Sequence, residues 1–304
     1  MHYLLENKLA QVNEATIDNT FFSTTLEVAV SGGHLSVIKT LLDYGADVME
    51  PCKSVREPPL HRAVARGYLD LTRYLLEKRA DVNYLTPELG TALGEACRQG
   101  DVAIVKLLLA WGANLEWPGS FDNALQIACW RGYAEVVSLL LKEGANIHAE
   151  GKVRGDALQC ACSSRERDSV EIVRSLLDKG ANVNAKPASL GTALQCAVFG
   201  YNMIEGRLAM GTSPRYEGVF VKPRVRPRKV DIAARSKAIV RLLLEHGAEV
   251  NDPPGLYGTA LQAARAKGHR EVVELLLSYG AREIPIGEIG KEQMEALQKY
   301  NMAS

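Results

Sequence analysis

The chain has 304 residues, of which 47% are hydrophobic and 6% are aromatic, so most of its apolar side chains are aliphatic. This balance favours packed helices over an aromatic-rich β-sandwich. Lys plus Arg and Asp plus Glu both number 36, so no net charge draws the chain toward nucleic acid or an anionic membrane.

The start of the chain, residues 1–13, lacks the apolar core of a signal peptide. No stretch approaches the roughly 18 apolar residues that a membrane span requires. We therefore expect no membrane partner and a cytoplasmic or nuclear location. Residues 3–13 are similar to residues 74–83 with one extra residue, which indicates an N-terminal half-repeat. This half-repeat is either a degenerate cap or the cut end of a longer array.

A phrase of Leu-Leu followed by Gly-Ala, or by Arg-Ala in one copy, recurs seven times. Successive alanines of this phrase are spaced by 34, 33, 32, 36, 67 and 33 residues. They are Ala46, Ala80, Ala113, Ala145, Ala181, Ala248 and Ala281. The glycine before most of these alanines favours the left-handed turn that ends a helix.

A second phrase, of the type Gly-Thr-Ala-Leu-Gln, precedes the first at a nearly constant distance and predicts another helix. Its polar residues stand where a helix N-cap belongs; they are Thr91, Asn123, Asp156, Thr192 and Thr259. The following helix, such as residues 134–141, is apolar over more than one face, as a helix between two neighbours requires. Each repeat is therefore a helix–turn–helix unit.

These units resemble ankyrin repeats, which have a period of about 33 residues and a Thr-Pro-Leu-His-x-Ala phrase. The best local match is Pro59-Leu60-His61-Arg62-Ala63, and the Gly-Thr-Ala-Leu-Gln variant is similar to repeats common in fungal ankyrin proteins. The resemblance covers residues 1–283. It implies an all-α solenoid of about seven stacked repeats with loop or β-hairpin tips, and a role for His61 in bonding the backbone of the adjoining turn.

The spacing of 67 leaves 34 extra residues near 201–234. Within 207–230, seven cations accompany a single acid, and three prolines oppose helix and central strand. A solvated insertion explains this composition. The alternatives are a partner-binding or nucleic-acid-contacting arm, a nuclear import signal, a retained intron or a decayed repeat. Residues 284–304 predict a C-terminal cap helix and tail.

The six cysteines do not have the close spacing of a zinc site, although several recur at equivalent helix positions. We expect them to pack in the core as small apolar side chains. The sequence also lacks a phosphate-binding loop and the motifs of zinc proteases and serine hydrolases. We therefore expect no catalytic residue, metal ligand or cofactor, and a protein that is not an enzyme.

The resemblance implies that the chain binds another protein through the concave face of its first helices and through its loop tips. Large aromatic and arginine side chains favour such interfaces. Mapped onto this sequence, the candidates at the tips are Tyr84, Trp117, Phe121 and Tyr257, and those on the first helices are Arg66, Arg98, Gln99, Trp130, Arg131, Phe199 and Lys267.

Trp117 and Trp130 are the expected centre of this surface, unless several of the candidates fold back on neighbouring loops. We expect a monomeric scaffold or adaptor. Three alternatives are open: a regulatory or sensing fragment of a larger multidomain protein, a nucleic-acid contact through the basic insertion, and an enzyme that uses the repeats as a scaffold.

Overall fold

The computed structural model describes residues 25–49, 58–86, 90–116, 122–151, 155–164, 166–185, 191–199, 229–252 and 258–283. These ranges contain 14 helices and no strand, and an isolated antiparallel β-bridge joins Thr86 to Gly90. The prediction of an all-α fold is confirmed. The predicted half-repeat at 1–13 and the C-terminal cap at 284–304 lie outside the described residues.

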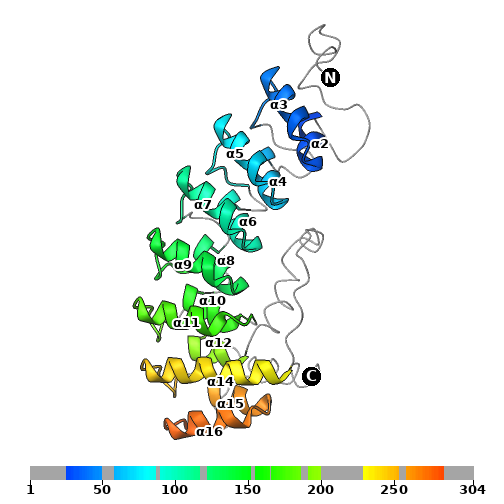
Figure 1. Ribbon diagram of the computed structural model, residues 1–304. Coiled ribbons are helices and arrows are strands. Elements are labelled where there is room, and N and C mark those ends of the chain that lie inside the picture. Colours follow the sequence, from blue (N-terminus) through cyan, green and yellow to red (C-terminus); the bar gives the residue numbers. More distant parts are fainter. Residues whose placement is uncertain are drawn as a thin grey trace. The chain divides into compact units, whose positions relative to one another are not determined.

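Residues 1–117 form one compact unit, which contains three helix pairs. The first helices pack side by side in one layer and the second helices form the other layer (Figure 1). The pairs are α2 (Thr25–Gly32) with α3 (Leu35–Asp43), α4 (Pro59–Ala65) with α5 (Leu69–Glu77), and α6 (Ala92–Gln99) with α7 (Val102–Ala110).

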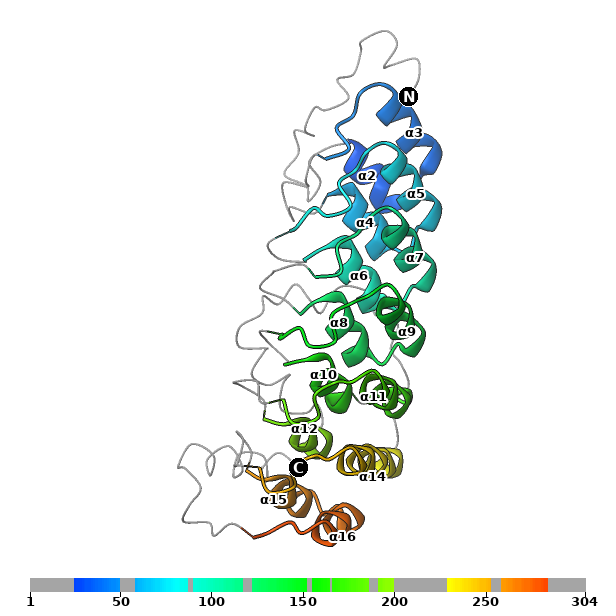
Figure 2. The ribbon, with the colours of Figure 1, turned by 90° about the vertical axis from the view of Figure 1, so that its left-hand side faces the viewer.

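Residues 118–304 form a second unit, which contains four helix pairs in the same two-layer arrangement (Figure 2). Each first helix packs on the next, and each second helix does the same. The pairs are α8 (Ala124–Arg131) with α9 (Ala134–Lys142), α10 (Ala157–Ser163) with α11 (Ser169–Asp178), α12 (Ala193–Phe199) with α14 (Lys229–Glu245), and α15 (Ala260–Ala266) with α16 (Arg270–Ser278).

Helix α14 differs from the other second helices because it has 17 residues, whereas α9 has nine. Its first residues, 229–234, lie in the predicted insertion, so that part of the insertion is helical. The helix begins two residues after Pro227, the last of the three prolines that oppose helix there. Residues 200–228 lie outside the described part of the chain.

The predicted N-caps of five first helices are confirmed, since each accepts a hydrogen bond from the backbone amide of the N3 residue; they are Thr91, Asn123, Asp156, Thr192 and Thr259. Asn123 accepts a hydrogen bond from the Gln126 amide at 2.9 Å, and the Gln126 side chain accepts one from the Asn123 amide at 2.8 Å. This reciprocal capping box satisfies two N–H groups that lack partners within the helix. Thr91 caps α6 without the reciprocal bond because Gly94 has no side chain.

The core lies between the two helix layers of each unit. Val136, Val137 and Leu140 of α9 are buried, which confirms the wide apolar surface expected for a second helix. The cysteines among the described residues are Cys97, Cys129, Cys160, Cys162 and Cys196, and all are buried free thiols, as the core-packing prediction requires. Burial raises the pKa of Cys196 to about 12, so its thiol is protonated at neutral pH.

An asparagine after the second helix makes two hydrogen bonds to the repeat that follows. We call this pair of bonds the asparagine staple. Asn184 donates to the Gly247 carbonyl at 3.0 Å and accepts from the Glu249 amide at 2.9 Å. Asn83 and Asn251 make the equivalent two bonds to the repeats that follow them. The staple satisfies a carbonyl at the end of a second helix, where intrahelical partners are missing.

Candidate protein-binding surface

Eight of the eleven predicted partner-binding residues lie in the described part of the chain. Trp117, Phe121 and Tyr257 lie outside it. Of the eight, four belong to the first unit and four to the second.

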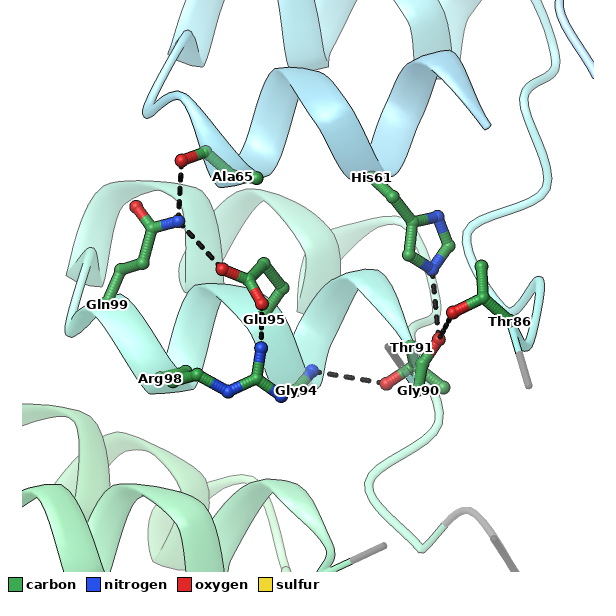
Figure 3. A network of polar contacts seen from close by, with 9 residues as sticks. All are labelled: His61, Ala65, Thr86, Gly90, Thr91, Gly94, Glu95, Arg98 and Gln99. Atoms are coloured by element: carbon green, nitrogen blue, oxygen red, sulfur yellow. Dashed lines mark hydrogen bonds and ion pairs between the residues drawn. The ribbon is translucent and has the colours of Figure 1, made fainter. Parts of the chain in front are cut away.

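In the first unit, Arg98 and Gln99 belong to a polar network at the end of α6 (Figure 3). Arg98 pairs with the carboxylate of Glu95, which is only 6% exposed. Gln99 donates from Nε2 to Glu95 Oε1 at 2.9 Å and to the Ala65 carbonyl of α4 at 2.7 Å. The network therefore fixes both predicted side chains and ties α6 to α4.

Glu95 is a residue that the sequence prediction missed. It stands one position after the N3 residue of its helix, where α4 carries Arg62 and the first helices of the second unit carry residues such as Ile127, Cys160 and Ala263. An acid at a position that is small or apolar in most first helices was the available signal. Its buried charge is compensated by Arg98, as a buried carboxylate requires.

Tyr84 follows α5 and is half-buried against a neighbouring side chain. Its ring lies 6.2 Å from the His61 ring in an edge-to-face arrangement, with an interplanar angle of 83°. The alternative that a tip residue folds back on its surroundings therefore applies at Tyr84. The remaining candidate in this unit, Arg66, is the exposed C-cap residue of α4.

In the second unit, Trp130 and Arg131 lie together at the end of α8, and both are half-buried. The Arg131 guanidinium lies over the Trp130 ring, 4.5 Å from its centroid. Such a cation–π contact holds both side chains in a defined arrangement. The pair presents a flat, cationic and aromatic surface, which is the chemistry that interface hot spots favour.

Phe199 and Lys267 are connected to each other rather than simply exposed. The Phe199 ring is 7% exposed, so it offers a partner little contact area. The Lys267 ammonium donates to the Phe199 carbonyl oxygen and so links α15 to α12. Lys267 is half-buried, and part of its hydrogen-bonding capacity serves this link.

Four large apolar side chains exposed among the described residues were not predicted. Val28 of the first helix α2 is 46% exposed. The other three belong to second helices, on the layer opposite the predicted surface; they are Trp111 at the C-cap of α7, Leu277 in α16 and Tyr279 at the C-cap of α16. For Trp111 and Tyr279 the signal was an aromatic residue directly before the Gly-Ala phrase.

No group of three or more His, Cys, Asp or Glu residues in the described ranges could hold a metal ion. Of the helices that the structure describes, none combines the length and the apolar character needed to cross a bilayer.

Comparison with protein families identifies the repeats. A family model described as ankyrin repeats (3 copies) matches residues 1–86, 26–118, 60–151 and 125–206. A second model, ankyrin repeats (many copies), matches residues 232–277.

Solved structures with the same fold are also ankyrin repeat domains. The human ASB11 ankyrin repeat domain aligns with a TM-score of 0.64 and 26% identity, over 86% of this chain and 100% of that one. The Bcl-3 ankyrin repeat domain aligns with a TM-score of 0.59 and 26% identity, over 84% and 98% of the two chains.

The curated relatives are much longer than the matched segments. The probable E3 ubiquitin-protein ligase XBOS33 of Oryza sativa subsp. japonica is 47% identical over 57 residues, which are 19% of this chain and 11% of the relative. Alpha-latrocrustotoxin-Lt1a of Latrodectus tredecimguttatus is 33% identical over 39% of this chain and 8% of its own length. Ankyrin repeat protein nuc-2 of Neurospora crassa is 28% identical over 37% of this chain and 11% of its own length. These three relatives come from a plant, a spider and a fungus, so the similarity identifies the ankyrin repeat, and the resemblance to fungal repeats stays a prediction.

Proposed function

Because the chain belongs to the ankyrin-repeat family, we propose that it is a scaffold or adaptor that binds a partner protein through its first-helix layer and loop tips. The mechanism is non-covalent. The observation that carries this proposal is the Trp130–Arg131 pair, a stacked aromatic and guanidinium held on the end of α8. Tryptophan and arginine are the residue types on which binding energy concentrates.

The first-helix layer is also held in place before any partner arrives. Gln99 bridges α6 to α4, and Lys267 bridges α15 to α12. Side chains that are already ordered lose less conformational entropy when they bind. A rigid layer with ordered hot-spot residues therefore supports tight binding without a conformational change.

The experiment is affinity capture with the immobilised full chain, followed by quantitative mass spectrometry. Trp130→Ala should reduce the recovery of the specific partner at least several-fold, since it removes a hot-spot side chain. Trp111→Ala is the matched control, because Trp111 is also accessible but lies on a second helix. Equal recovery with wild type and Trp130→Ala, with both proteins folded by circular dichroism, would reject the proposed surface.

A second candidate, the repeat part of a larger multidomain protein, is favoured by the lengths of the relatives. The matched segments are 11% of the rice ligase and 8% of the spider toxin. In this role the repeats would recruit a protein for another domain to act upon. Transcript sequence around the coding region tests it, because an in-frame second domain would support this role and flanking stop codons would reject it.

We propose a cytoplasmic or nuclear location and a monomeric chain. The buried free thiols of Cys97 and Cys162 support a reducing compartment. Fluorescence imaging of the tagged chain and light scattering of the purified chain test these two statements.

A further inference from the structure

The first helices of the N-terminal unit present positive charge to solvent and keep negative charge underneath. Arg66 is exposed, and Arg62 and Arg98 are partly exposed. Glu27 and Glu95 are each 6% exposed. No other Lys, Arg, Asp or Glu occurs in α2, α4 or α6. We call Arg62, Arg66 and Arg98 the arginine row.

Arg62 and Arg66 lie one turn apart on α4, at positions i and i+4 of the same side. Like charges at this spacing repel each other. An anion that binds beside both guanidinium groups would reduce this repulsion.

Neighbouring side chains hold two members of the arginine row in place. Arg62 donates from Nη1 to Ser31 Oγ of α2 at 3.0 Å, and Arg98 pairs with Glu95. Gln99, bonded to both Glu95 and the Ala65 carbonyl, fixes the end of α6 beside the end of α4 (Figure 3). A guanidinium held in this way offers carboxylates a planar set of donors at a low cost in entropy.

An apolar side chain continues the row on α2. Val28, Arg62 and Glu95 occupy equivalent positions in the three first helices, and Val28 is 46% exposed. A ligand that runs along the layer therefore meets an apolar contact beside the arginines. This combination fits a polypeptide with acidic and aliphatic residues better than it fits a nucleic-acid backbone, which has no aliphatic side chains.

We infer that the first-helix layer of the N-terminal unit binds an acidic segment of a partner protein, with the carboxylates of that segment on Arg62, Arg66 and Arg98 and an aliphatic side chain on Val28. This inference rests on the proposed function and names the chemistry of the partner segment. Protein carboxylates, and not phosphates, are the ligand because the row continues into the exposed apolar side chain of Val28, which an aliphatic residue of a polypeptide covers and a phosphodiester backbone does not.

Fluorescence anisotropy with the full chain tests the inference. The probes are three labelled 12-residue peptides that share two leucines in a Ser-Gly background and differ in carrying four Glu, four Gln or four Lys. We expect the Glu peptide to bind on the order of tenfold more tightly than the Gln peptide, and the Lys peptide to bind least. The double variant Arg62→Gln/Arg66→Gln should lose this preference, and Val28→Ser should weaken binding of all three peptides.

Arg73→Gln is the matched control, because Arg73 is an exposed arginine on the second helix α5 and its loss should leave the affinity unchanged. Arg62→Lys/Arg66→Lys, which keeps the charge but not the planar donors, should retain part of the preference. Thermal melts of each variant show that the fold is intact. If a variant does not fold, the test rests on Arg62→Lys/Arg66→Lys and on the titrations of the wild-type chain with the three peptides.

Equal binding of the Glu and Gln peptides by wild-type chain would overturn the inference. Tighter binding of a 12-nucleotide single strand or of phosphatidylserine vesicles than of the Glu peptide, with the same dependence on Arg62 and Arg66, would also overturn it. Trp130→Ala separates this result from the proposed function, since it should leave binding of the Glu peptide unchanged. A captured partner that depends on Trp130 but is not displaced by the Glu peptide would refute only this inference, whereas failure to capture any partner refutes the proposed function.

Discussion

The imidazole Nε2 of His61 lies 3.1 Å from the carbonyl oxygen of Gly90, the residue before the N-cap of the next repeat. Gln159 makes the same connection in the second unit, where its Nε2 lies 2.9 Å from the carbonyl oxygen of Gly191. The two residues hold the same N3 position of their first helices. A histidine in one repeat and a glutamine in another therefore perform the same bridging task.

The N-caps of the two helices differ. Gln159 also accepts a bond from the Asp156 amide through Oε1 at 3.0 Å. The N-cap of α4 is Pro58, which has no amide hydrogen to donate. A glutamine at position 61 would therefore leave its Oε1 without that donor, and His61 leaves its buried Nδ1 without a hydrogen-bond partner among the described residues.

We predict a loss of stability at mildly acidic pH that is caused by His61. Burial lowers its pKa to about 4, against about 6.5 in the unfolded chain. Between pH 6.5 and pH 4 the imidazole of His61 is therefore protonated in the unfolded state but not in the folded state. The free energy of unfolding falls as the pH drops through this range. The loss should approach about 3 kcal/mol at the lower end of this window.

Urea unfolding of the N-terminal repeats at pH 7 and pH 5 measures this loss. His61→Gln should differ from wild type by no more than about 1 kcal/mol at pH 7, because each side chain can bridge to Gly90 and each leaves one buried polar atom without a partner in the described part of the chain. It should also lose less stability than wild type on acidification. His148→Gln is the control, since His148 is exposed. An unchanged pH dependence in His61→Gln would show that the imidazole is not responsible.

The repeats and their caps could be predicted from the sequence because both depend on local chemistry. A Thr, Asn or Asp at the N-cap satisfies amides within three residues, so Asn123 and Thr259 are recognisable without knowledge of the fold. The bridging role of His61 was available only through the family resemblance, because its acceptor, Gly90, lies 29 residues away.

The surface chemistry was harder to predict, because part of it depends on contacts between repeats. Gln99 reaches the Ala65 carbonyl, 34 residues away, and Lys267 reaches the backbone of Phe199, 68 residues away. Neither of these two contacts has a pattern within one repeat. The composition of 201–234 indicated an insertion throughout, but residues 229–234 include no proline or glycine and extend α14.

Arg79→Gly should stabilise the N-terminal unit. Arg79 has a φ of 68°, in the left-handed region that the equivalent glycines, such as Gly112 at 79°, adopt freely. A side chain with a Cβ costs about 1 kcal/mol there, so removing it should raise the unfolding free energy by about 0.5–1 kcal/mol. Chemical denaturation measures the gain.

The control for this substitution is Arg79→Ala, which removes the charge but keeps the Cβ. We expect little or no gain from it, because the backbone strain persists. If Arg79→Ala stabilises the chain as much as Arg79→Gly does, the charge and not the backbone is the cause.

Asn184→Ala should destabilise the second unit through loss of an asparagine staple. The substitution removes the bond to the Gly247 carbonyl and the bond from the Glu249 amide. Two bonds at a partly exposed site should contribute about 1–2 kcal/mol together. The control is Lys179→Ala, because Lys179 is exposed. Asn182→Ala is less suitable, since the Asn182 side chain accepts a hydrogen bond from the amide of Asn184. Hydrogen exchange at the Glu249 amide should quicken in Asn184→Ala, and unchanged exchange there would contradict the role of the staple.

His148→Asn should create a staple that the wild-type chain lacks. His148 follows α9 at the position that Asn184 holds after α11, and its exposed imidazole makes no staple bonds among the described residues. An asparagine there would face the carbonyl of Gly180 and the amide of Asn182, the counterparts of Gly247 and Glu249. We expect a gain of about 1 kcal/mol in unfolding free energy. His148→Ala separates the staple from simple removal of the imidazole, because alanine cannot make either bond. If both variants gain the same unfolding free energy, the asparagine side chain makes no staple between these repeats. If only His148→Asn loses stability, the backbone at position 148 does not allow the two bonds of the staple.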